Sequence, residues 1–186
     1  MPVTHHPIVM SEEIYFKNTF LSQKNKLYRF AFFFLKETDE AKDATQETLI
    51  KIWDKREEWH KVENPDAWSM QIIKNNCLDR LRKTKTVQKH QANLNFAQST
   101  DQNPGTISIW QDQWKLLQQV LNQLSDKQKA VFILREIEGN SYQEIAESLE
   151  ISEAQVKSDL FRSRKYLKET MLKINNHGIG TTRTMA

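Results

Sequence analysis

Apolar residues in the first half of the chain recur every three to four positions, which is helical spacing. They predict helices over residues 11–35, 38–58 and 64–81. The third helix has the clearest start, because Asn64 can cap it and Pro65 suits its first turn. The three helices together predict a first helical domain.

The second half of the chain contains three helix starts in a row. Ser125, Ser141 and Ser152 are each followed three residues later by Gln or Glu, the spacing of a capping box. A short helix and a tight turn fit between Ser141 and Ser152, and the helix that starts at Ser152 completes a predicted helix-turn-helix. Its expected buried residues are Ile145, Ala146, Leu149, Ile151 and Val156.

The segment between these two halves is rich in Gln and Asn and poor in apolar residues. We interpret it as a flexible linker, and a polar surface helix is the alternative. A long amphipathic helix follows from Trp110 to Leu124 and should pack on the helix-turn-helix. The predicted parts are a disordered tail (1–10), a first domain (11–85), a linker (86–106), a second domain (107–174) and a disordered tail (175–186).

Composition agrees with an all-helical chain of two small domains, since 186 residues include only four Gly and four Pro. The net charge is +3, so any nucleic-acid contact must come from local patches. The single cysteine, Cys77, excludes an intramolecular disulfide and indicates a small core residue in a reducing, cytoplasmic compartment. No apolar segment reaches the roughly 18 to 20 residues that span a bilayer.

No catalytic or cofactor-binding pattern is visible. The five histidines are scattered, and no Cys or acidic partner has metal-ligand spacing. Phosphate-loop and nucleophile-elbow motifs are also missing from the sequence. We therefore predict a binding protein with no enzymatic activity, no metal and no cofactor.

The last predicted helix is strongly basic. Six basic and two acidic residues lie between Gln155 and Lys173, which suits a DNA major groove, although a solvated charged face is the alternative. Glu144, Glu147, Glu150 and Glu153 oppose the DNA interpretation unless they point away from the phosphates. The candidate contacts are Lys157, Ser158, Phe161, Arg162, Arg164 and Lys165.

The end of the third predicted helix suits unpaired DNA. Arg80, Arg82 and Lys83 can follow a backbone, while Trp68 and Asn75 can contact bases. The alternatives are that the cations favour a helix C-terminus and that Trp68 is a core residue.

The second predicted helix has an acidic face that would repel DNA. This face combines Asp43, Gln46, Glu47, Ile50 and Trp53. It should either be solvated or bind a basic protein partner through a large aromatic anchor.

Three segments in this order resemble the extracytoplasmic-function group of the sigma-70 family. They are DATQETLIKIW at 43–53, NPDAWSMQIIKNNCLDRLRK at 64–83 and VKSDLFRSRKYL at 156–167. The resemblance implies a subunit that binds core RNA polymerase and directs initiation by recognising and melting the −10 and −35 promoter elements. A stand-alone helix-turn-helix regulator, with a dimeric effector domain and a ligand pocket, is the alternative.

The resemblance also implies roles for matching residues. It assigns the acidic face to the clamp of the largest polymerase subunit, the second domain to the flap of the second subunit, and the last helix to the −35 element. It further implies an anti-sigma factor as a partner, with no direct membrane insertion. The residues implied for the −10 element are Trp59, Asn64, Trp68, Asn75, Asp79, Arg80, Arg82 and Lys83.

Four positions depart from the family pattern. Glu150 and Ala154 stand where Gly is frequent, so Glu150 should carry modest strain if its φ is positive. Asp159 replaces a frequent Arg, which puts one −35 phosphate contact in doubt. Asp79 replaces an amide that faces the −10 element.

Overall fold

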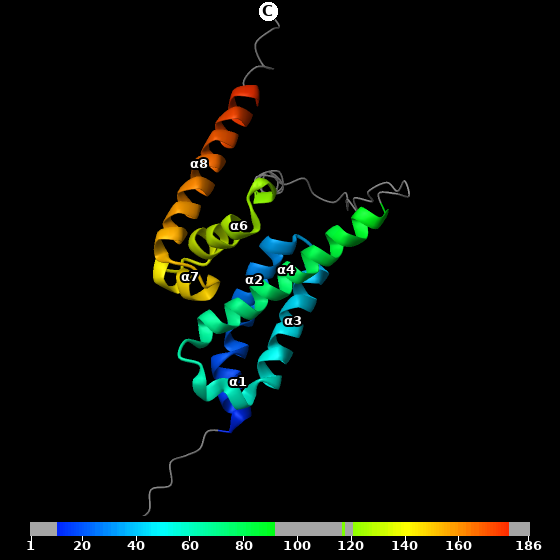
Figure 1. Cartoon of the computed structure of the whole chain (residues 1–186), viewed down its shortest axis with the longest axis vertical. Coiled ribbons are helices and arrows are strands. Elements are labelled where there is room, and N and C mark those ends of the chain that lie inside the picture. The colour runs from blue at the N-terminus through cyan, green and yellow to red at the C-terminus, as the bar shows by residue number, and fades with distance from the viewer. Residues whose placement is uncertain (1–10, 92–116, 118–120, 179–186) are drawn as a thin grey trace, which may run out of the picture.

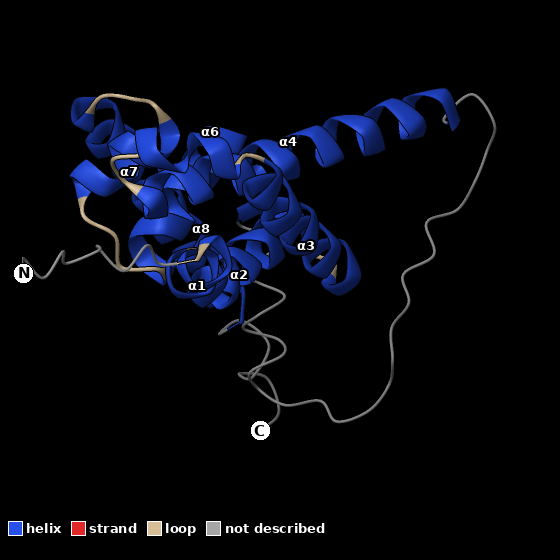
Figure 2. Ribbon diagram, turned by 90° about the horizontal axis from the view of Figure 1, so that it is seen from below, coloured by secondary structure: helices blue, strands red, loops and turns tan. Residues whose placement is uncertain are grey.

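The computed structural model describes residues 11–91, 117 and 121–178, and the side chains of these residues except 85, 87–91 and 174–178. Every regular element in this part is helical, which confirms the predicted class of two helical regions (Figure 2). The elements are α1 (Glu12–Thr19), η1 (Leu21–Gln23), α2 (Lys24–Leu35), α3 (Thr38–Asp54), η2 (Arg56–Lys61), α4 (Pro65–Gln91), α6 (Asp126–Phe132), η3 (Ile133–Ile137), α7 (Tyr142–Leu149) and α8 (Glu153–Gly178).

The predicted helix over residues 11–35 is divided into α1, η1 and α2. Two side chains take carbonyls that a continuous helix would use. The Ser22 hydroxyl donates to Asn18 O at 2.8 Å, and the Gln23 amide donates to Thr19 O at 2.7 Å. Such side-chain bonds compete with the helical ladder, and the chain tightens into a single 3-10 turn.

The second predicted helix ends at Asp54, short of Glu58. The indole of Trp59 folds back and donates to Ile52 O at 3.0 Å, so it caps the last turn of α3. A 3-10 segment, η2, replaces the predicted final turn.

Helix α4 begins where the sequence predicted, with Asn64 Oδ1 accepting from Ala67 N at 3.1 Å. It ends later than expected, since the helix extends past Lys85 and stops at Gln91. Residues 86–91, the first part of the predicted linker, are therefore helical. They contain neither Gly nor Pro to stop the helix. The rest of the predicted linker lies outside the described residues.

Two of the three predicted capping boxes are complete, at Ser125 with Gln128 and at Ser141 with Glu144. At the third, Ser152 accepts from Gln155 N at 3.2 Å, but the Gln155 amide donates to Asp159 at 2.9 Å. Helix α8 then runs to Gly178, so residues 175–178 belong to a helix and not to a tail. Most of the predicted helix from Trp110 to Leu124, the N-terminal tail (1–10) and residues 179–186 lie outside the described residues.

Glu150 has the positive φ on which the expected strain depends. Glu150 adopts φ 55° and ψ 48° in the turn between α7 and α8, where it ends α7 in the left-handed region. Residues with a side chain adopt this region at a cost in free energy. The sharp turn between α7 and α8 requires the left-handed conformation at this position.

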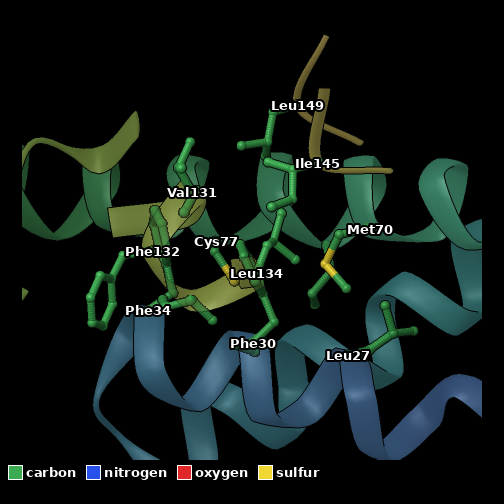
Figure 3. Close-up of a cluster of buried hydrophobic side chains, with 14 of the residues drawn as sticks. Leu27, Phe30, Phe34, Met70, Cys77, Val131, Phe132, Leu134, Ile145 and Leu149 are labelled. Carbon is green, nitrogen blue, oxygen red and sulfur yellow. The ribbon is translucent and has the colours of Figure 1, made fainter. Parts of the chain in front are cut away.

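The two helical regions pack against each other around one apolar core. In Figure 1, α6 and α7 lie beside α2 and α4, whereas α8 extends away from the first region. We refer to this packing as the closed arrangement. The shared core includes Phe30 and Phe34 of α2, Met70 and Cys77 of α4, and Val131, Leu134, Ile145 and Leu149 of the second region (Figure 3). None of the described helices is long and apolar enough to cross a membrane.

Candidate nucleic-acid and protein interfaces

Helix α8 presents a basic and aromatic surface to solvent. Val156 and Leu160 turn inward, which leaves Lys157, Phe161 and Arg162 on the outer side. Phe161 is 69% exposed, the highest value among the exposed large apolar side chains that the structure describes. Lys165 is also exposed and Ser158 is half-buried, so five of the six predicted contacts border one accessible surface.

Arg164, the sixth predicted contact, is engaged within the second region. Its guanidinium donates to Glu136 at 3.0 and 2.6 Å, and these bonds raise its pKa. By contrast, Lys157 lies only 3.8 Å from exposed Glu153 and 5.7 Å from the Tyr142 ring. Exposed pairs of this kind are weak, so Lys157 remains available to a phosphate.

The Asp159 carboxylate does not share the outer surface of α8. It is buried and accepts a hydrogen bond from Gln155 at 2.9 Å, with Arg162 at 4.0 Å. Its negative charge is therefore turned toward the core side of the helix.

The acidic residues of α7 face the first helical region. The Glu147 carboxylate accepts from Asn64 Nδ2 at 2.6 Å and from Gln143 at 3.0 Å. Glu144 accepts from the Ser141 backbone and side chain, which lowers its pKa, and the charge of Lys26 on α2 adds to this shift. Glu144 and Glu147 therefore point away from the outer surface of α8, as the DNA interpretation requires, whereas exposed Glu153 lies 3.8 Å from Lys157 on that surface.

The outer side of α3 is an exposed ridge, which we call the α3 ridge and define as Asp43, Gln46, Glu47 and Ile50. Ile50 is 59% exposed among these polar residues. Trp53, predicted to close this face, is half-buried instead. Its ring packs edge-on against Phe16 at 5.2 Å between centroids. The ridge is thus accessible, while its predicted aromatic anchor belongs to a cluster of rings.

Arg80, one of the −10 candidates, is held by the acidic residues of α3. Its guanidinium forms ion pairs with Glu40 and, at 2.6 Å, with Glu47, and it donates to Asn76 at 3.1 Å. Partial burial raises the pKa of Glu47, but the hydrogen bond and charge of Arg80 outweigh burial and lower it. The sequence did not predict this pairing.

A pocket of about 420 Å³ opens beside the start of α4. Trp68 lines it and packs on Phe20 at 5.7 Å between ring centroids. Trp59, predicted as a DNA contact, is only 7% exposed and lies among these rings, so it supports the pocket from below and cannot stack on a base. The lining residues are Glu58, Lys61, Val62, Glu63, Asn64, Ala67, Trp68, Gln71 and Glu147.

The remaining −10 candidates lie farther along α4. Asn75, Asp79, Arg82 and Lys83 are all exposed. Arg82 pairs with Asp79 at 3.1 Å, which partly neutralises this carboxylate. The pocket and this exposed side form one continuous candidate surface on α4.

Sequence reasoning missed the groups that join the two regions. Glu138, whose side chain is 2% exposed, accepts two hydrogen bonds from Arg29 at 2.9 and 2.7 Å. Lys129 is buried and donates to the carbonyl of Phe34 at the end of α2. These partners are far apart in sequence, so no local spacing could have indicated them. Across the described residues, no cluster of His, Cys, Asp and Glu could hold a metal ion.

Comparison with known proteins identifies relatives of both regions. Residues 20–87 match the family described as Sigma-70 region 2, and residues 114–167 match Sigma-70, region 4. The chain is 27% identical to ECF RNA polymerase sigma factor SigX of Bacillus subtilis, over 78% of the chain and 77% of that protein. It is 30% identical to RNA polymerase sigma factor YlaC of the same organism, over 72% and 78%. The structure of the sigma factor RpoE in complex with the anti-sigma factor NepR from Bartonella quintana has a TM-score of 0.66 at 28% identity, over 84% of this chain and 96% of that one.

Proposed function

This chain belongs to the extracytoplasmic-function group of the sigma-70 family, whose members direct RNA polymerase to promoters, and we propose that three of its surfaces divide that task. The α3 ridge binds polymerase, the outer side of α8 binds the −35 element, and the α4 pocket with its flanking side binds the −10 element. The chain is a binding subunit and not an enzyme. Matches to both sigma-70 regions decide against a stand-alone regulator.

The exposure of the α3 ridge is the observation that carries the polymerase assignment. Ile50 stands in solvent between acidic residues that DNA would repel, which fits a basic protein surface with an apolar centre. Arg80 holds the Glu47 carboxylate in place before binding, so less side-chain freedom is lost on docking. The proposed partner surface is the clamp of the largest subunit.

The outer side of α8 supports −35 recognition by its mixture of groups. Exposed Lys157 and Arg162 suit phosphates or guanine edges, and Phe161 suits a thymine methyl group. Arg164 contributes by holding the helix against Glu136. We propose that the rest of this region docks on the flap of the second subunit.

The pocket beside α4 supports capture of an unpaired base of the −10 element. Trp68 offers an aromatic wall, and Asn64 and Gln71 offer amides that can bond to base edges. Asn75, Arg82 and Lys83 would then follow the strand along α4. The buried rings of Phe20 and Trp59 keep this wall rigid.

We further propose an anti-sigma factor as a partner. The solved relative RpoE was captured in complex with one, and its fold covers most of this chain. Because bacterial RNA polymerase works in the cytoplasm, we propose the same compartment for this chain.

Competition for core polymerase tests the assignment of the α3 ridge. We expect Asp43→Ala with Glu47→Ala to lower the affinity for core by about tenfold, which corresponds to ~1.4 kcal/mol. The matched control is Glu13→Ala with Glu169→Ala, which removes two exposed carboxylates elsewhere and should leave the affinity unchanged. Equal affinities for the two double variants would refute the polymerase role of the ridge.

A further inference from the structure

The pocket beside α4 has one wall that belongs to the second helical region. Glu147 of α7 lines it together with Trp68, Gln71 and Asn64. The Glu147 carboxylate lies 2.6 Å from the Asn64 amide, one of the groups that the proposed function gives to an incoming base. A charged acceptor therefore already occupies the edge of a pocket proposed for nucleic acid.

Both oxygens of this carboxylate are bonded. One accepts from Asn64 and the other from Gln143, one turn earlier on α7, so the side chain is held in position. Asn64 is fixed as well, because its Oδ1 caps α4 at Ala67 N while its Nδ2 faces Glu147. Two pre-positioned groups thus meet across the boundary between the regions.

The surrounding contacts favour the same arrangement. The first region contributes cations and the second contributes acids, as in the two-bond pair between Arg29 and Glu138. Lys26 lies close enough to lower the pKa of Glu144, and Glu150 raises the otherwise burial-lowered pKa of Lys74. Beneath these charges lies the shared apolar core (Figure 3).

We propose that Glu147 is an internal ligand of the α4 pocket. In the closed arrangement, its carboxylate competes with single-stranded −10 DNA for the side-chain amide of Asn64. This inference rests on the proposed function of the pocket. The closed arrangement therefore weakens binding of the −10 strand, while the outer side of α8 stays accessible to DNA. Separation of the two regions removes the carboxylate and frees the amide.

Cys77 supplies a native reporter of this separation. It is the only cysteine of the chain and is fully buried in the shared core, so a maleimide dye reaches it only when the core opens. The charge-reversal variant Arg29→Glu is the positive control for labelling, because it repels Glu138 across the same boundary. Its labelling must be faster than that of the unaltered chain.

The experiment compares Glu147→Ala with Glu169→Ala in the full chain without polymerase. Glu169 is an exposed acid of α8, so the control removes the same charge. The probe is a fluorescein-labelled single strand of the −10 sequence that the holoenzyme selects from a random pool, and its anisotropy gives the affinity. We expect Glu147→Ala to raise both the strand affinity and the labelling rate of Cys77 by about two- to tenfold. We expect Glu169→Ala to change neither.

Strand affinity in Glu147→Ala that equals the control overturns the proposal. A parallel measurement separates this failure from failure of the proposed function. If Gln71→Ala in the holoenzyme impairs promoter opening while Glu147→Ala leaves the free chain unchanged, the pocket binds DNA and only the internal competition is wrong. If Gln71→Ala leaves promoter opening intact and the strand affinity does not respond to Glu147→Ala, both ideas fall together.

Discussion

The two basic helices, α8 and α4, meet their surroundings in different ways. Helix α8 presents Lys157 and Arg162 to solvent, and their acidic partners on the same helix, Glu153 and Asp159, lie no closer than 3.8 and 4.0 Å. On α4, Arg80 is held by the acids of α3, and Glu147 of α7 lines the pocket at the start of the helix and engages Asn64. The comparison shows that the cations of a basic helix are available to DNA only where no neighbouring acid already pairs with them. In the closed chain the −35 surface is displayed, whereas the −10 surface is covered at Asn64 and Arg80 and stays exposed farther along α4.

The largest expected effect concerns the shared core, which joins the second helical region to α2 and α4. Phe30→Ala removes a fully buried ring from the shared core and should lower the free energy of unfolding by about 3–5 kcal/mol. Because one core joins the regions, both should unfold in a single transition. Urea denaturation followed by circular dichroism measures both quantities.

Phe161→Ala is the matched control on the displayed side. The same substitution at a ring that is 69% exposed should change stability by less than about 0.5 kcal/mol. Two separate transitions in the unaltered chain would show that the regions do not share one core.

The next effect concerns DNA affinity on the displayed side. Lys157→Ala with Arg162→Ala should lower the affinity of holoenzyme for promoter DNA by about ten- to hundredfold, since it removes contacts to phosphates or bases. Filter binding at several salt concentrations should also give a shallower salt dependence. Lys17→Ala with Lys24→Ala removes two exposed cations from α1 and α2 and serves as the control. A loss no greater than in this control would remove α8 from the −35 assignment.

Features set by neighbouring residues were predictable from the sequence. The capping boxes at Ser125 and Ser141 and the start of α4 at Asn64 depend on contacts three residues apart, so spacing alone indicates them. The buried position of Cys77 followed from the apolar period of its helix. The helical spacing of Asp43, Gln46, Glu47 and Ile50 likewise predicted that these residues share one face of α3.

The features that were missed depend on distant partners. Asn64 and Glu147 are 83 residues apart, and Arg29 and Glu138 are 109 residues apart, so no periodicity encodes either pair. The family resemblance assigned Trp59 to the −10 element, but its indole is buried and caps α3. The sequence therefore indicated which helices carry charge but not which charges are already paired.

A smaller effect should appear at alkaline pH on the covered side of α4. Burial raises the pKa of Cys77 from 9.0 to about 12, against the opposing charges of Arg80 and Lys129. Between these values the unfolded chain loses the thiol proton and the folded chain keeps it. Stability should therefore be unaffected below pH 9 and should fall by about 1.4 kcal/mol per pH unit above it.

Cys77→Ala isolates this contribution, since the tyrosines and lysines titrate in both chains. Denaturant midpoints measured across about pH 8–11 should fall less steeply for the variant than for the unaltered chain. Parallel curves would mean that the thiol already meets solvent in the folded state.

The smallest effect compares the two non-glycine residues that the described part of the chain holds at positive φ. Lys36 ends α2 at φ 71°, and Glu150 ends α7 at φ 55°. Glycine adopts this region without the side-chain clash, although it also adds freedom to the unfolded chain, so Lys36→Gly should stabilise by about 0.5–1 kcal/mol. Glu150→Gly should gain less, because it also removes the negative charge near Lys74 of α4. Thermal denaturation of both variants, with and without Lys74→Met, measures the difference. An equal gain in stability for Glu150→Gly with and without Lys74→Met would mean that Glu150 does not help to hold the second region against α4. The contrast with α8 would then depend on the apolar core, Arg29 and Glu147 alone.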